Sequence, residues 1–213
     1  MDVRQFEDKR WAGEDQKMQF RHRACLELIE SGTVLDLGSG DGLLLSLLKK
    51  KGISGRGLDL SQVGVNKARA KGLETEVFDF ANQALPFPDD SFDTVTMLDV
   101  LEHLYNPEFV IREAKRVARK NLIIRVPNFS SLPARSQTLF GRVPENNRPK
   151  KGHVYWFNFF ILQDILKRNN ISQIEWRANV ILENFPILGS LTRLLSKIWP
   201  NLFCLSFVVK VKI

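Results

Sequence analysis

The chain has 213 residues, of which 44% are hydrophobic and 26% are charged, and it carries a formal net charge of +7. Its length suits one α/β domain with a large core. No apolar run approaches the roughly 20 residues that cross a bilayer. The charged N-terminal segment lacks the apolar run of a signal peptide, and Cys25 and Cys204 match neither a disulfide framework nor a zinc ligand set. We therefore expect a single cytoplasmic domain.

Strand and helix patterns alternate along the first part of the chain. Strands are predicted at residues 33–37, 55–60, 74–80, 94–98 and 121–126. Helices are predicted between them at 43–51, at 61–71 with Ser61 as N-cap, and from Asn106 to about residue 119. This alternation favours a doubly wound α/β fold, in which helices cover both faces of a mostly parallel sheet.

The second part of the chain is less regular. Residues 129–152 have weak periodicity and three prolines, which predicts a long, partly ordered insertion that serves the active site. Further predicted elements are a helix at 158–168, an amphipathic helix at 188–199, and strands at 173–178 and 204–211. Arg193 and Lys197 lie opposite the leucines of the amphipathic helix. We expect this helix to pack on the sheet, and contact of residues 188–207 with a membrane surface is the alternative.

The N-terminal segment, residues 1–30, places four large apolar side chains among charges: Phe6, Trp11, Met18 and Phe20. A charged helix with several large apolar side chains must pack on something. We therefore predict a helical lid that closes over the site and excludes water, followed by one domain at residues 31–213. A plain surface helix is the alternative.

The stretch VLDLGSGDG, residues 34–42, is a predicted buried strand followed by a turn with three glycines. Such a turn lets a ligand approach the backbone closely. The dinucleotide fingerprint needs a third glycine where Leu43 stands, and the phosphate loop of ATPases needs a lysine that this turn lacks. The turn therefore argues against a nicotinamide, flavin or ATP ligand.

Carboxylates gather at this turn and at the ends of the next strands. Asp36 precedes the turn, Asp41 lies inside it, and Asp59 and Asp79 end the second and third predicted strands. The ends of parallel strands share one edge of a sheet, which is the usual ligand edge. Carboxylates repel a pyrophosphate, whereas S-adenosylmethionine (SAM) offers a sulfonium, an ammonium, a ribose diol and an adenine amine. We predict that Asp59 accepts from the ribose hydroxyls and Asp79 from the adenine amine, with simple capping of helices and turns as the alternative.

Taken together, these motifs resemble a known family. VLDLGSGDG, GLDLS, VFDF and LPFPDDSFDTVTMLDVLEHL, in that order, are similar to the motifs of Rossmann-like, class I SAM-dependent methyltransferases, the type 11 group in particular. The resemblance implies a seven-stranded sheet whose last strand, at 204–211, is antiparallel. It also implies SAM as cofactor and S-adenosylhomocysteine (SAH) as product. The predicted cofactor-binding residues are Asp36, Gly38, Ser39, Gly40, Asp59, Leu60, Asp79, Phe80 and Leu98.

A narrower resemblance begins at the end of the fifth predicted strand. The segment VPNFSSLPARSQTLFGRVP, residues 126–144, is similar to the corresponding segment of the methionine biosynthesis protein W (MetW) family, and His153 with the helix after it also fits. The stretch LDVLEHL is closer to small-molecule O-methyltransferases of the ubiquinone-biosynthesis type.

Methyl transfer from a sulfonium needs alignment of donor and acceptor, and a hydroxyl or amine acceptor can also need a base. His103 and His153 are the candidate bases. The alternative for His103 is a structural histidine hydrogen-bonded to the backbone, and the alternative for His153 is a histidine packed under the loop. If DVLEH is helical, Asp99, Glu102 and His103 share one face and form a candidate site for Mg²⁺ or a transition metal.

Several functions are compatible with these residues. The leading hypothesis is a SAM-dependent methyltransferase that acts on a small molecule, most simply on oxygen. A MetW-like partner or regulator of a biosynthetic enzyme is a second hypothesis. The sequence is also compatible with binding to a protein partner and with a homodimer. A nucleic-acid methyltransferase is a third, suggested by the basic charge. It is disfavoured because the basic segments 111–120 and 141–151 do not interleave aromatic residues, and residues 98–101 replace the proline-proline motif of many amino-methylating enzymes.

Overall fold

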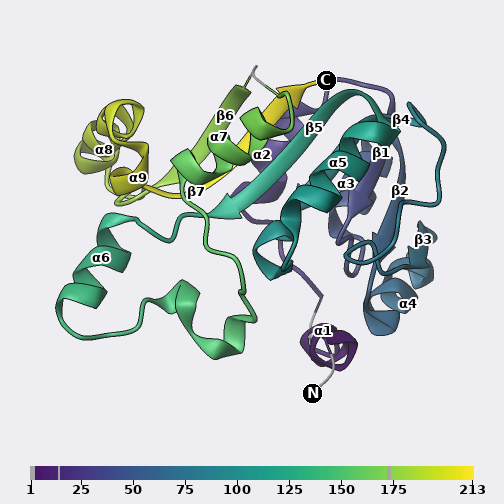
Figure 1. Cartoon of the computed structure of the whole chain (residues 1–213), viewed down its shortest axis with the longest axis horizontal. Coiled ribbons are helices and arrows are strands. Elements are labelled where there is room, and N and C mark those ends of the chain that lie inside the picture. Colours follow the sequence, from purple (N-terminus) through teal and green to yellow (C-terminus); the bar gives the residue numbers. More distant parts are fainter. Residues whose placement is uncertain (1–2, 14, 172–173) are drawn as a thin grey trace.

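The computed structural model describes residues 3–13, 15–171 and 174–213. A seven-stranded sheet runs through its centre in the order β3-β2-β1-β4-β5-β7-β6 (Figure 1). The strands are β1 (Thr33–Leu37), β2 (Ser54–Asp59), β3 (Glu74–Val77), β4 (Phe92–Leu98), β5 (Ala118–Pro127), β6 (Ile174–Val180) and β7 (Cys204–Lys212). Strands β1 to β5 pair in parallel, and β7 is antiparallel to both of its neighbours. The predicted fold class, including the antiparallel last strand, is confirmed.

Helices cover both faces of the sheet, as predicted. They are α1 (Val3–Trp11), α2 (Phe20–Leu28), α3 (Leu43–Lys50), α4 (Gln62–Ala70), α5 (Pro107–Val117), α6 (Leu132–Leu139), α7 (Phe159–Arg168), α8 (Pro186–Ile198) and α9 (Pro200–Phe203). Short 3₁₀ turns are η1 (Leu101–His103), η2 (Glu145–Asn147) and η3 (Pro149–Lys151). The apolar faces of α5 and α7 form one core with the sheet, and those of α2 and α3 form a second. Among the described residues no helix is long and apolar enough to cross a bilayer.

Local signals in the sequence account for several of these boundaries. The hydroxyl of Ser61 accepts from the N–H of Gly64, so it caps α4 as predicted. The amide oxygens of Asn106 and Asn158 cap α5 and α7 in the same way. Gly72 follows the end of α4 with φ of +69°, a conformation that favours glycine at this position.

Two predicted elements differ from the structure. The third strand ends at Val77 because its partner β2 ends opposite it, at Asp59, so Asp79 lies two residues beyond the strand. Residues 129–152 contain α6, which the weak periodicity did not predict because that helix buries only Ala134.

Helix α8 touches β6, as expected for a helix packed on the sheet. The side that it buries carries Gly189, Thr192 and Ser196. Its leucines Leu188, Leu191 and Leu194 are exposed. The amphipathic pattern therefore did not indicate which side of this helix packs inward.

Helix α1 lies beside the edge of the sheet where the parallel strands end (Figure 1). Asp8 of α1 accepts hydrogen bonds from the hydroxyl of Ser61, at 2.6 Å, and from the N–H of Val63, at 3.2 Å. These contacts fix α1 to the start of α4.

Candidate active site

A cavity of about 430 Å³ lies at the carboxyl ends of β1, β2 and β4. Eight of the nine predicted cofactor-binding residues line it: Asp36, Gly38, Ser39, Asp59, Leu60, Asp79, Phe80 and Leu98. Helix α1 lines the other side of the cavity with Val3, Glu7, Arg10 and Trp11. The strand-end pattern of the sequence thus places these residues together as expected, and their binding roles stay predictions.

The glycine turn after β1 brings backbone close to two different neighbours. Gly38 has φ of +76°, and a side chain on it would meet Val100 Cγ2 at 2.4 Å. Gly40 has φ of +52°, and its missing side chain leaves room for the indole ring of Trp11, 2.2 Å from where a Cβ would stand. Gly40 therefore lets α1 pack closely against the turn through Trp11, whereas Gly38 lines the cavity.

Two aspartates of the cavity are almost fully buried. Asp36 accepts from the hydroxyl of Thr96 at 2.7 Å, and burial raises its pKa to about 7. Asp59 accepts from the N–H of Gly40, at 2.7 Å, and of Ser61, at 2.8 Å, and burial raises its pKa as well. A ligand that brings positive charge or hydrogen-bond donors would stabilise both carboxylates.

Asp79 also lines the cavity, although it stands outside β3. Its side chain accepts from the backbone N–H of Ala81 and the side-chain amide of Asn82. The loop after β3, rather than the strand, therefore positions this carboxylate.

A second cavity, of about 820 Å³, adjoins the first. Arg10, Arg21, Asp99 and His103 line both cavities. The walls of the second cavity come from α6, from residues 144–151 and from the ends of β5, β6 and β7. Two adjoining cavities are the arrangement that a donor and an acceptor need.

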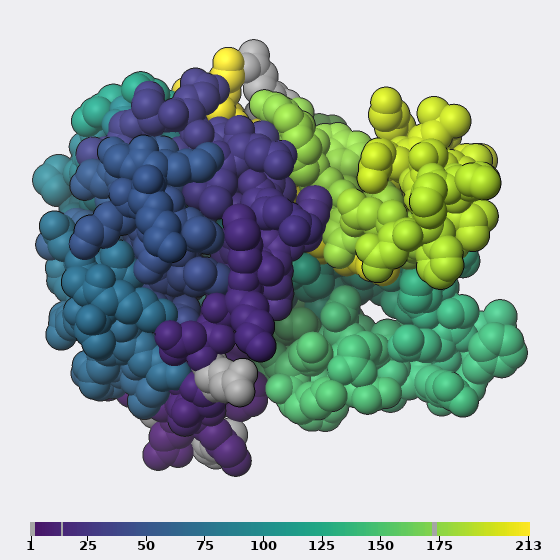
Figure 2. Space-filling view, turned by 180° about the vertical axis from the view of Figure 1, so that it is seen from behind, coloured from purple at the N-terminus to yellow at the C-terminus, as the bar shows by residue number. Residues whose placement is uncertain are grey.

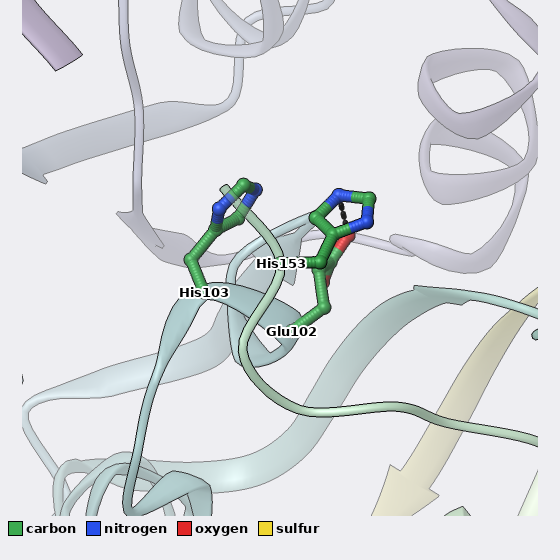
Figure 3. Close-up of side chains that lie close together, drawn as sticks. All are labelled: Glu102, His103 and His153. Atoms are coloured by element: carbon green, nitrogen blue, oxygen red, sulfur yellow. Dashed lines mark ion pairs between the residues drawn. The ribbon is translucent and has the colours of Figure 1, made fainter. Parts of the chain in front are cut away.

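Both candidate histidines lie next to Glu102 (Figure 3); His103 lines both cavities, and His153 lines the second. Nδ1 of His103 is 3.1 Å from the carbonyl oxygen of Gly152, and Nδ1 of His153 is 2.7 Å from that of Asn146. Because a carbonyl oxygen only accepts, each Nδ1 carries the proton, and each Nε2 keeps its lone pair. Nε2 of His153 is 4.0 Å from a carboxylate oxygen of Glu102.

Burial sets the charges in this cluster. It raises the pKa of Glu102 to about 8 and lowers the pKa of His103 to about 3, with Arg10 and His153 adding to the second shift. Burial also lowers the pKa of His153. One oxygen of Glu102 has no hydrogen-bond partner among the described residues. At neutral pH both imidazoles are therefore neutral, and each keeps an Nε2 lone pair that can accept a hydrogen bond or bind a cation, although that of His103 lies 3.4 Å from the guanidinium of Arg10.

The predicted helical face of Asp99, Glu102 and His103 is wrong. The 3₁₀ turn η1 covers only residues 101–103, and Asp99 precedes it with φ of +61°. Asp99 instead forms ion pairs with Arg21, at 2.9 Å, and with Arg125. Among the residues that the structure describes, the group whose ligand atoms come within 4.8 Å of one another is Glu102, His103 and His153.

The residues of the two cavities that were not predicted include Arg10, Arg21, Arg125 and Asn179. Arg125 is the one with a visible signal, because it interrupts the otherwise apolar strand NLIIRV. No spacing in the sequence connects Arg21 with Asp99, which is 78 residues further along the chain.

The sheet order, the glycine turn and the carboxylates at the strand ends define the fold of SAM-dependent methyltransferases. A SAM-dependent methyltransferase from Archaeoglobus fulgidus superposes with a TM-score of 0.70 at 17% identity, over 100% of both chains. Magnesium protoporphyrin IX methyltransferase from Synechocystis, with bound SAH, superposes with a TM-score of 0.66 at 19% identity, over 99% of this chain and 97% of that one. The chain belongs to the family of methionine biosynthesis protein MetW, whose sequence model matches residues 19–210. Both predicted resemblances are thus confirmed.

Curated relatives match shorter stretches. The ubiquinone biosynthesis O-methyltransferase of Alkalilimnicola ehrlichii is 32% identical over 45% of this chain and 40% of its own length. The phosphatidylethanolamine N-methyltransferase of Cereibacter sphaeroides is 34% identical over 53% of this chain and 61% of its own. The matches therefore span about half the length of these relatives.

Proposed function

We propose that this chain is a SAM-dependent methyltransferase that transfers a methyl group to an oxygen of a small-molecule acceptor in the cytoplasm. The observation that carries the proposal is the pair of adjoining cavities, which share His103. SAM would occupy the first cavity and the acceptor the second. Family membership and the named methyltransferases among the relatives support the activity.

The first cavity fits a cationic adenosine compound. Asp59 would accept from the ribose hydroxyls with the lone pairs that Gly40 and Ser61 leave free, and Asp79 from the adenine amine. Asp36 would face the positively charged methionine part, whose ammonium and sulfonium would favour its ionised form. Arg21, which lines the same cavity, is suited to the cofactor carboxylate. SAM supplies an already activated methyl group, so the chain mainly aligns and desolvates the reactants.

Helix α1 would act as the lid of this site. It holds Trp11 against Gly40 and Arg10 within 3.4 Å of Nε2 of His103. A shift of α1 would break these contacts and widen the way into the cavity. Closure after binding would exclude water from the methyl group.

The charges around the second cavity favour oxygen as the methylated atom. Arg10, Arg21 and Arg125 line this cavity. They would repel an ammonium acceptor but not a neutral hydroxyl. As the methyl group forms its bond to the acceptor oxygen and leaves sulfur, Nε2 of His103 would take the hydroxyl proton. His103 is suited to this role because its Nδ1–H is already fixed on Gly152.

A divalent metal ion also fits the cluster of Glu102, His103 and His153. Both imidazoles direct Nδ1–H to backbone carbonyls, as metal-bound histidines usually do. The buried oxygen of Glu102 that lacks a partner is available as a ligand, and a cation there would replace its proton. Such an ion would lower the pKa of an acceptor hydroxyl.

The test is SAH release from SAM with matched hydroxyl and amine acceptors, with and without a chelator. We expect turnover with a hydroxyl compound, and a loss of about 10²- to 10⁴-fold in His103→Gln, while calorimetric SAH affinity changes little. Loss of turnover on chelation would show that a metal ion takes part, and unchanged turnover would show that it does not. Absence of SAM and SAH binding in the unaltered chain would contradict the whole proposal.

Family membership favours one second candidate, a SAM-binding partner of a biosynthetic enzyme. This role would leave cofactor binding intact without turnover on any acceptor. Co-purification of a partner enzyme whose activity changes when SAH is added would separate this candidate from the first.

A further inference from the structure

Helix α8 presents its apolar side to solvent. Ile187 is 85% exposed and Ile198 is 65% exposed, and Leu188, Leu191 and Leu194 between them are also exposed. The side packed inward carries Gly189, Thr192 and Ser196. The hydroxyl of Thr192 donates to the carbonyl oxygen of Ile181 at 2.8 Å, and a side chain on Gly189 would meet the carbonyl oxygen of Glu183 at 2.9 Å. The orientation is therefore fixed by close packing, and the apolar side stays outward.

A second apolar group stands at the same end of the molecule. It comprises the exposed side chains Leu132, Leu139, Phe140 and Val143, in and just after α6. Helix α6 contacts α9, which follows α8 directly. Figures 1 and 2, which look from opposite sides, both show α6 and α8 at the end of the long axis away from β3.

Positive charge is concentrated in the same two segments. Residues 129–152 and 182–203 contain two acidic residues, Glu145 and Glu183. They contain seven basic ones: Arg135, Arg142, Arg148, Lys150, Lys151, Arg193 and Lys197. Seven minus two gives a net charge of +5, out of +7 for the whole chain. A second copy of the chain docked on this end would bring +5 against +5, which disfavours self-association.

We infer that the exposed sides of α8 and α6 form a docking surface for an anionic lipid bilayer, with α8 lying in the headgroup plane. Interfacial helices combine an apolar side with basic residues on the rest of the helix, as α8 does with Arg193 and Lys197. Phe185 and Trp199 flank α8 and are both exposed, at the positions where aromatic rings sit among headgroups. The negative headgroups of an anionic bilayer would attract this end of the molecule, whose two segments carry a net charge of +5.

This surface adjoins the second cavity. Pro133, Ala134 and Gln137 of α6 line that cavity, while Leu132 and Leu139 of the same helix face outward. A docked molecule would therefore hold the cavity next to the bilayer.

The direct test is co-sedimentation of the full chain with vesicles of phosphatidylcholine alone and of equal parts phosphatidylcholine and phosphatidylglycerol. We expect binding to the mixed vesicles, weakening as salt is raised, and little binding to phosphatidylcholine alone. Failure to bind the mixed vesicles at low salt would overturn the inference. So would capture of an acidic protein by this end without any vesicle binding.

Paired variants locate the surface. Leu191→Gln with Leu194→Gln should abolish most of the vesicle binding, while Phe160→Gln, at a residue 64% exposed on α7, should leave it unchanged. Arg193→Gln with Lys197→Gln should weaken binding about 25-fold, at about fivefold per basic residue. Lys50→Gln with Arg112→Gln, on α3 and α5, is the charge-matched control. Equal losses in variants and controls would overturn the inference, as would a dimer that dissociates in the Leu191→Gln variant.

Discussion

The two cavities of the site are built in different ways. Around the first cavity, strands end within one or two residues of Asp36, Gly38 and Asp59, and the turn is tied to its neighbour by the hydrogen bond from Gly40 to Asp59. Around the second cavity, α2, β5 and a distant loop supply Arg21, Arg125 and His153. A site whose residues directly follow neighbouring strands, at one edge of the sheet, can be predicted from the sequence. A site made where distant segments meet needs the tertiary structure.

Among changes at the site itself, the largest effect is expected in the second cavity, at Asp99. Its carboxylate stands between two largely buried guanidiniums, those of Arg21 and Arg125. Asp99→Ala leaves both cations without their shared anion, so we expect a loss of about 3 kcal/mol in the free energy of unfolding. Urea denaturation measures this.

A double-mutant cycle with Arg21→Met separates charge from packing. Removal of both partners should cost less than the sum of the single changes, because the uncompensated charge is then smaller. If Asp99→Ala left the stability unchanged and altered only metal content, Asp99 would be a ligand, and the observed ion pairs would not describe its role.

The second prediction concerns His22, in the first turn of the helix that carries Arg21. Its Nδ1 accepts from the N–H of Gln19 at 3.1 Å, and burial, with Arg21 adding, lowers its pKa from 6.5 to about 4. Between these two pH values the unfolded chain binds the proton and the folded chain does not. Stability is therefore full above pH 6.5 and falls as the pH drops toward 4, by about 2 kcal/mol.

Thermal unfolding from pH 7 to pH 4 checks this slope. His22→Gln cannot bind the proton, and its side-chain oxygen can accept from Gln19 in the same position. The variant should lose less stability across this window than the unaltered chain. Parallel slopes for the two proteins would show that His22 titrates normally in the folded state.

The features that the sequence predicted correctly are those that depend on residues close together in the chain. The cap at Ser61 and the turn at Gly38 depend on atoms a few residues apart. The pairing of Asp99 with Arg125 depends instead on register, because β4 and β5 pair Leu98 with Arg125. The side on which α8 packs depends on its fit to Ile181, which no periodicity in α8 itself encodes.

The third prediction tests the first cavity with two glycines that share a backbone conformation. Gly38 and Gly52 have φ of +76° and +73°, but only Gly38 has a neighbour in the way, since Gly52 has no atom within 4 Å of its Cβ position. Gly52→Ala should cost about 1 kcal/mol, the strain of the left-handed region alone. Gly38→Ala should cost about 1–2 kcal/mol more because it must displace Val100.

Chemical denaturation of the two variants gives these differences, and calorimetry gives the affinity for SAH. Gly38→Ala should also weaken SAH binding, whereas Gly52→Ala should not. Equal affinities in the two variants would mean that the turn does not approach the cofactor.

The smallest expected effect lies on α8, which lines neither of the two cavities. Leu191 is 50% exposed and Leu45 of α3 is 2% exposed, although both are helical leucines. Leu45→Ala should cost about 2–4 kcal/mol, because it removes buried contacts and leaves a cavity. Leu191→Ala should cost less than about 0.5 kcal/mol, as surface substitutions usually do. A large loss for Leu191→Ala in dilute solution would mean that this side of α8 is covered within the chain or by a second copy. In that case, it could not be the surface that meets lipid.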